Sequence, residues 1–167
     1  MLALLRIFGL LLLAAFILFG LWCAFVNFTG RESSRWFGGR PSTLGVNDGK
    51  LSGPKATPNS VLSEGVDSGH PAYVAPIPFS GDPQAAIARL GTIIQALDRV
   101  TVVRAETDYM HVEFRSKTMG YIDDFEARVD SQANVIHVRS ASRLGRRDMG
   151  VNRARIELLR KKFAESQ

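Results

Sequence analysis

The 167-residue sequence predicts an α+β domain behind an N-terminal transmembrane helix. The first observation is an uncharged, apolar stretch between Arg6 and Arg31. The second is a run of four segments with strand-like alternation, joined by connectors too short for crossover helices. The third is a segment of helical periodicity on each side of that run. The expected order is β-α-β-β-β-β-α, which gives one antiparallel sheet of four to five strands with two helices on one face.

Residues 7–28 form the apolar segment, in which Asn27 is the one strongly polar residue. A helix that rises about 1.5 Å per residue crosses a hydrocarbon core of about 30 Å within roughly 20 residues. A cleaved signal peptide is the alternative, but Trp22 is bulky where a cleavage site needs a small residue. The same Trp22 disfavours lipidation of Cys23. We therefore predict an uncleaved anchor over residues 1–30 that contacts membrane lipid through residues 7–28.

Composition excludes several classes of protein. The single cysteine, Cys23, rules out an intrachain disulfide framework and zinc or redox motifs of the CxxC type. HExxH, P-loop, GxGxxG and GxSxG motifs do not occur in the sequence. We therefore predict no catalytic residue, no metal and no cofactor, and a non-enzymatic role is favoured.

Residues 31–70 are predicted to form a turn-rich tether. Gly, Ser, Pro and Asn recur along them, and neither a helical nor an alternating pattern persists. Such a composition is typical of an extended connector that lies along the surface of a domain. Regular patterns begin at residue 71, so the α+β domain is expected over residues 71–167.

Local signals predict the elements of this domain. Residues 73–79 are extended, but Pro76 and Pro78 restrict them to the edge of a sheet. Asp82 followed by Pro83 marks the start of a helix, and apolar residues at helical spacing continue it over 83–98. Strands are expected over 100–106, 109–116, 120–129 and 134–140, and a second helix over 149–163.

Alternation within the strands separates an apolar face from a polar one. We expect the helices on the apolar face, and a solvated ladder of ion pairs rather than a metal site on the other. The polar face carries His111, Glu113, Arg115, Asp124, Glu126, Arg128, His137 and Arg139. Asp123 is the exception, because its parity places a carboxylate on the apolar side. We expect an arginine from the C-terminal segment to pair with it.

Residues 139–162 hold most of the positive charge, with nine basic residues against Asp148 and Glu157. Two interpretations stay open. One is a structural polar network that includes Asp123, Asp124, Arg115 and His137. The other is a pocket for a phosphate or carboxylate. Its candidate ligand-binding residues are Arg139, Ser140, Arg143, Asn152, Arg153 and Arg155. Aromatic residues interleaved for base stacking are absent, so no nucleic-acid partner is expected.

Several segments together carry a family resemblance. They include residues 44–51, residues 57–61, the run Arg139-Ser140-Ala141-Ser142-Arg143 and the run Gly150-Val151-Asn152-Arg153. Over residues 44–163 the sequence resembles a bacterial family known as domain of unknown function number 1499. The resemblance implies no activity, because none is assigned to the family. It also implies cysteines at two positions that here are Pro54 and Ser60, so this chain does without whatever that pair provides.

We therefore predict a membrane-anchored, non-enzymatic binding or assembly domain of the bacterial cell envelope. The alternative is a small-anion receptor or enzyme that uses an arginine-rich pocket around residues 139–155. Expected partners are membrane lipid, anionic headgroups contacted by the basic C-terminal helix, and an envelope protein. Three arginines after the span, against Arg6 before it, would leave the domain in the cytoplasm. The family resemblance instead favours a single-pass protein of the inner membrane whose domain faces the periplasm.

Overall fold

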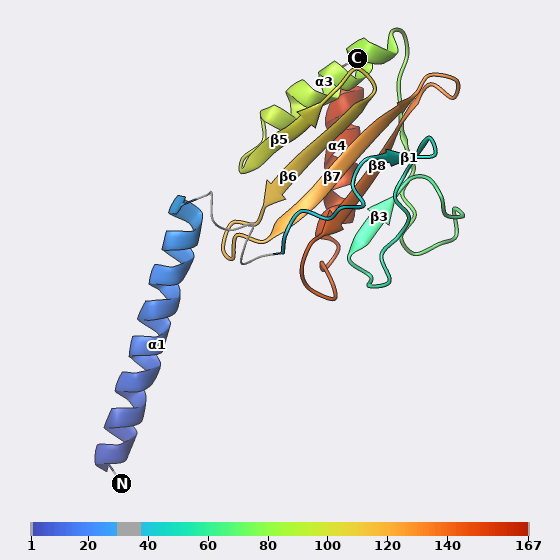
Figure 1. The fold of residues 1–167 in the computed structure, drawn as a ribbon. Helices are drawn as coiled ribbons and strands as arrows, with labels where there is room; N and C mark the ends of the chain where they lie inside the picture. The colour runs from blue at the N-terminus through green and yellow to red at the C-terminus, as the bar shows by residue number, and fades with distance from the viewer. Residues whose placement is uncertain (1, 30–37, 167) are drawn as a thin grey trace.

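The computed structural model describes residues 2–29 and 38–166. Helix α1, Leu2–Thr29, contains the apolar segment Leu4–Phe25, which is long and apolar enough to cross a membrane (Figure 1). No other helix among the described residues meets this test. By length and composition the segment suits a membrane anchor or a signal sequence.

A six-stranded antiparallel sheet forms the centre of the domain. Its four long strands are β5 (Val100–Ala105), β6 (Tyr109–Arg115), β7 (Ile122–Asp130) and β8 (Val135–Ser142). They follow one another as a meander, as the short connectors predict. Two short strands, β3 (Ser60–Leu62) and β4 (Ile77–Pro78), pair with successive parts of the free edge of β8. Strand β4 is the proline-containing segment for which an edge position is predicted.

Two helices, α3 (Pro83–Gln95) and α4 (Val151–Glu165), cover one face of the sheet (Figure 1). Asp82 caps α3 as predicted, since its Oδ2 accepts a hydrogen bond of 2.7 Å from the Ala85 amide. Gly91 lets α3 approach β6 closely, because a Cβ there would lie 2.7 Å from Met110 Cε. The α+β class and the placement of the helices are confirmed. Apolar side chains from both layers form the core, among them Leu90, Ile94, Phe125, Ile136, Ile156, Leu159 and Phe163.

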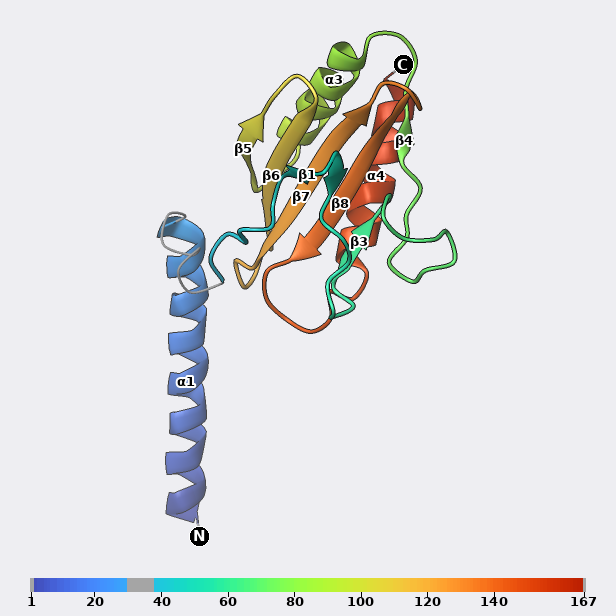
Figure 2. The same cartoon turned by 45° about the vertical axis from the view of Figure 1, so that its right-hand side comes forward.

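Residues 38–64 cover the other face of the sheet. They include the hairpin of β1 (Val46–Asn47) and β2 (Lys50–Leu51), and Figure 2 shows this hairpin across β7 and β8. Near the end of these residues, strand β3 pairs with β8 and belongs to the sheet itself. We call residues 38–64 the covering segment.

This cover differs from the sequence prediction in two respects. The folded part of the chain begins well before residue 71, because β3 is a strand of the main sheet. The polar face is buried and not solvated, since His111, Asp124, Glu126 and Arg139 are each at most 5% exposed. Alternation indicates which side chains share a face of the sheet, but it does not indicate whether another segment covers that face. Strands of two or three residues, such as those of the covering segment, are too short to show an alternating pattern. Residues 31–37 of the predicted tether lie outside the described residues.

Candidate functional site

Ionisable side chains gather between the sheet and the covering segment, and we call this group the covered polar cluster. Antiparallel pairing aligns them, because Glu113 lies opposite Asp124 and Glu126 lies between His111 and Arg139. Directly opposed side chains of this kind are within reach of one another. The cluster comprises Glu64, His111, Glu113, Asp124, Glu126, Arg128, Arg139 and Arg143.

Arg143 joins two carboxylates of neighbouring strands. Its Nη2 lies 2.5 Å from Glu113 Oε1 and 2.7 Å from Asp124 Oδ1, and its Nε lies 2.8 Å from Asp124 Oδ2. The side chain is only 1% exposed. Burial disfavours the charged guanidinium, but the hydrogen bonds to Asp124 and Glu113 outweigh it and raise the pKa of Arg143 above its ordinary value. Such bidentate, charge-assisted pairing is stronger than a neutral hydrogen bond and also fixes the geometry of the two groups.

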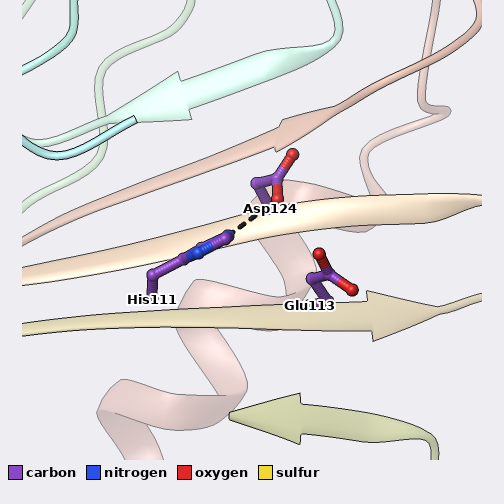
Figure 3. A group of neighbouring side chains, drawn as sticks. All are labelled: His111, Glu113 and Asp124. Carbon is purple, nitrogen blue, oxygen red and sulfur yellow. Dashed lines mark hydrogen bonds and ion pairs between the residues drawn. The ribbon is translucent and has the colours of Figure 1, made fainter. Parts of the chain in front are cut away.

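His111, Glu113 and Asp124 form a group that could hold a metal ion, and Figure 3 shows their side chains converging. Their potential ligand atoms lie within 4.8 Å of one another, and His111 Nε2 is 2.8 Å from Asp124 Oδ1. One imidazole and two carboxylates suit a divalent cation such as Zn²⁺. However, Arg143 Nη2 already contacts both carboxylates. A positive charge therefore occupies the position between them, which favours a salt-bridge network over a metal centre.

Glu126 connects the sheet to the covering segment. Its Oε1 accepts hydrogen bonds from the Gly45 amide at 2.7 Å and the Tyr109 hydroxyl at 2.8 Å, and its Oε2 accepts one from Arg139 Nη1 at 3.0 Å. Burial, together with the charge of Glu126, raises the pKa of Tyr109, so the phenol remains a donor. Three donors from three parts of the chain thus meet at one buried carboxylate.

Glu64 makes a second connection of this type. Arg128 pairs with it through Nη2 at 2.7 Å and Nε at 3.2 Å, and the Leu51 amide donates to Glu64 Oε1 at 3.0 Å. Burial opposes ionisation of Glu64, but these donors hold its pKa below the ordinary value. The carboxylate therefore fixes β2 to the sheet in its charged form.

Ser63, His137 and Asp130 have the composition of a hydrolytic triad. Ser63 Oγ lies 3.2 Å from His137 Nδ1, and His137 Nε2 lies 3.7 Å from Asp130 Oδ2. The Ser63 hydroxyl is buried, and its oxygen accepts a hydrogen bond of 2.8 Å from the Val138 amide. A nucleophile must reach its substrate, so the burial of Ser63 favours a structural role in which this group joins the end of β3 to β8.

A separate network lies on the helix side of β8. Asn152, which is fully buried in α4, accepts hydrogen bonds from Ser140 Oγ and Arg155 Nη1 and donates to Asn59 O and Ser142 Oγ. Arg155 Nη2 lies 2.6 Å from Asp123 Oδ2. The expected partner of Asp123, an arginine from the C-terminal segment, is therefore confirmed.

The structure distributes the predicted ligand-binding residues over three places. Arg139 and Arg143 belong to the covered polar cluster, whereas Ser140, Asn152 and Arg155 lie on the helix side. Arg153 lines a cavity of about 370 Å³ at the start of α4, with Lys55 and His70, and donates to Pro71 O. These arginines therefore do not converge on one pocket.

Of the residues predicted for the structural network, Asp124 lies in the covered polar cluster and Asp123 on the helix side. His137 contacts Ser63, and Arg115 is half-buried at the end of β6. Sequence reasoning missed Arg40, Gly45, Asn59 and Glu64, which lie in the predicted tether. Gly45 and Asn59 lie within the runs at residues 44–51 and 57–61, which could have revealed them, because a specific motif inside a turn-rich segment indicates ordered structure.

Comparison with known proteins also indicates that the domain begins before residue 71. A family model described as "Protein of unknown function (DUF1499)" matches residues 50–163, which is more than half of the chain. The chain belongs to the DUF1499 family. Neither the curated proteins nor the solved structures yielded a match. The DUF1499 match begins inside the covering segment, at β2, and ends in α4.

We expect the free energy of unfolding of this DUF1499 chain to decrease as the pH falls below about 4. Burial alone would raise the pKa values of Glu64, Glu113 and Asp124, but hydrogen bonds from arginines lower all three. A carboxyl with a lowered pKa stabilises the fold fully above its unfolded pKa and loses this effect as pH falls through the folded value. Thermal unfolding between pH 7 and 2 measures this dependence.

The control for the pH dependence compares two glutamates. Glu64→Gln should flatten the decrease at acidic pH, because the titrating group is gone. Glu157→Gln, at a position that is 54% exposed, should leave the slope unchanged. A melting temperature that stays constant down to pH 2 would contradict the expectation.

Proposed function

We propose that the protein is a membrane-anchored, non-enzymatic binding or assembly domain of the bacterial cell envelope. One observation carries the non-enzymatic part of this proposal. The polar groups of the sheet are used to hold the covering segment, the part of the chain that follows the anchor. Arg40 pairs with Glu113, the Gly45 amide with Glu126, and the Leu51 amide with Glu64.

Catalytic acids and bases need access to a substrate and a pKa near the working pH. In the covered polar cluster all four carboxylates, Glu64, Glu113, Asp124 and Glu126, have an arginine partner. Hydrogen bonds from these arginines lower the pKa values of Glu64, Glu113 and Asp124, and such carboxylates are poor proton donors and acceptors near neutral pH. The arrangement therefore supports a structural role, in which the cluster fixes the domain to the segment that leads to the anchor.

The membrane and envelope parts of the proposal have other support. The apolar segment Leu4–Phe25 supports anchoring. The resemblance to the family is our reason for proposing the bacterial inner membrane and the periplasmic side. The basic residues of the C-terminal part support anionic lipid headgroups or an acidic envelope protein as partners.

A second candidate function is a small-anion receptor. Two guanidinium N–H groups, Arg139 Nε and Arg143 Nη1, are buried and have no hydrogen-bond partner among the described atoms. Buried donors of this kind normally bind a water molecule or a ligand. Since both arginines already neutralise carboxylates, we favour ordered water at these atoms over an anion.

Fractionation of bacteria that produce the full chain tests the proposed function. We expect the uncleaved chain to remain in the membrane after an alkaline wash, and a reporter fused to its C-terminus to be active in the periplasm. The matched control is Leu13→Arg with Phe16→Arg, because each arginine at the centre of a span costs about 3 kcal/mol on insertion. A shortened, soluble product would contradict anchoring.

The same purified protein separates the two candidate functions. We expect inorganic phosphate, at an ionic strength matched by chloride, to leave its melting temperature unchanged. Stabilisation by phosphate that is lost in Arg139→Lys would instead favour the anion receptor, because lysine lacks the planar fork that binds oxyanions.

A further inference from the structure

The chain enters the domain next to the loop between β8 and α4, residues 143–150. Gly38 is the first described residue after α1, and a Cβ on it would lie 3.3 Å from Arg143 Cβ and 3.4 Å from Leu144 Cδ2. Eight residues, 30–37, separate Thr29 from Gly38. Fully extended, this length spans at most about 30 Å. The end of the domain that carries the loop is therefore held close to the end of the apolar helix.

The loop exposes apolar side chains. Met149 is 98% exposed, Leu144 is 42% exposed, and Val151, the first residue of α4, is 51% exposed. Single exposed apolar residues are normal on soluble proteins, so exposure alone would mean little. Here the residues cluster at one end of the domain, the end where the chain enters. An apolar cluster of this kind is typical of a surface that contacts a membrane or another protein.

The same loop carries unneutralised positive charge. Arg146 and Arg147 are exposed, and no acidic side chain among residues 38–166 forms an ion pair with either. By contrast, Arg139, Arg143 and Arg155 are neutralised by carboxylates. Three of the nine basic residues of 139–162 are thus neutralised internally, and the pair Arg146 and Arg147 is part of the charge that remains at the surface.

The loop is fixed at both ends. Asn59 Nδ2 donates to Gly145 O at 2.6 Å, and the Asp148 carboxylate accepts hydrogen bonds from the amides of Gly150 and Asn152 at 3.2 and 3.0 Å. Met149 has a φ of 52°, a left-handed conformation that is uncommon for a residue with a side chain. A loop held in this way presents its exposed side chains with little entropy left to lose on binding.

We propose that residues 143–150 dock on an anionic lipid surface, with Leu144 and Met149 entering the headgroup region and Arg146 and Arg147 binding lipid phosphates. Apolar burial and attraction to anionic lipid are the two terms that hold proteins at such interfaces. The inference rests on the proposed function, since α1 must stay in the membrane. The short connection of eight residues between α1 and Gly38 keeps the loop at a high effective concentration near the membrane surface, so weak contacts suffice.

Site-specific fluorescence in vesicles tests this docking with the full chain. In a Cys23→Ala background, a fluorophore is attached at Met149→Cys, and the vesicles contain a lipid-linked headgroup quencher. We expect strong quenching in vesicles of phosphatidylcholine with one-third phosphatidylglycerol and weaker quenching in phosphatidylcholine alone. The matched control is a label at Ser131→Cys, in the exposed turn between β7 and β8 at the opposite end of β8, which should stay unquenched.

Charge removal sharpens the test. Arg146→Gln with Arg147→Gln should lower the ratio of docked to undocked protein about 25-fold, since each arginine near an anionic surface contributes about fivefold. Equal quenching at both labelled positions, or equal quenching in both lipids, would overturn the docking proposed. Absence of quenching at residue 149 in a chain retained by the vesicles would overturn docking and leave the anchor intact. Loss of the chain from the vesicles would overturn both proposals.

Discussion

Arg143→Ala is expected to lower the free energy of unfolding by about 3–5 kcal/mol, the range for removing one partner of a buried ion pair. Arg143 Nη2 lies between Glu113 and Asp124, at 2.5 and 2.7 Å, so its loss leaves two carboxylates facing each other on neighbouring strands. Among the described residues, Glu113 keeps Arg40 as an ion-pair partner, whereas Asp124 keeps His111 alone. Chemical denaturation of the full chain in detergent measures the loss.

Arg40→Ala is the matched control for this substitution. Arg40 donates to the same Glu113 oxygen as Arg143, but its side chain is 52% exposed. Exposed ion pairs contribute about 1 kcal/mol or less, so we expect a small change. Arg143→Lys should fall between the two variants, because it keeps the charge and loses the bidentate contact. Equal losses for Arg40→Ala and Arg143→Ala would show that burial of the guanidinium is not what makes it important.

The sheet and helices could be predicted because their signals are local. Connectors of a few residues between alternating segments permit little besides a meander, and β5 to β8 follow it. The alternation of side chains within a strand also predicted one contact between residues far apart in the sequence. Asp123 falls on the apolar side of β7, a carboxylate there needs a cation, and Arg155 supplies it.

The contacts of the covering segment could not be predicted from local patterns, because they are made between residues far apart in the sequence. Glu64 and Asn59 stand in a stretch without periodicity, and their partners lie in β7 and after β8. The covering segment buries the polar face of the sheet, so the sequences of the strands themselves could not indicate this burial. A charged residue takes the same position in an alternating pattern whether its face of the sheet is open to solvent or covered by another segment.

The run Arg139-Ser140-Ala141-Ser142-Arg143 explains why one pocket was expected and two networks were found. Strand β8 continues to Ser142, beyond the predicted end at residue 140. Alternation therefore divides the run, with Arg139 and Arg143 on the covered face and Ser140 and Ser142 toward α4. The motif connects three layers, the covering segment, the sheet and the last helix, and this connection accounts for its composition without a ligand.

Asn152→Ala is expected to lower the free energy of unfolding by about 2–4 kcal/mol, because buried polar groups left without partners cost about 1–3 kcal/mol each. The substitution removes the donor to Asn59 O at 3.2 Å and to Ser142 Oγ at 3.0 Å, and the acceptor of the Ser140 hydroxyl. Asn152 is fully buried, so water cannot readily replace these contacts. Chemical denaturation of the full chain in detergent measures this loss as well.

Two comparisons separate this network from a general effect on the helix. Val151→Ala changes the neighbouring residue, which is 51% exposed, and should stay within about 0.5 kcal/mol of the native chain. Asn152→Asp keeps the shape of the side chain but turns the donor toward Asn59 O into an acceptor. We therefore expect it to destabilise at least as much as alanine, although Arg155 lies beside it. A native-like stability for Asn152→Asp would mean that shape, and not the direction of the hydrogen bonds, holds α4 to β8 and the covering segment.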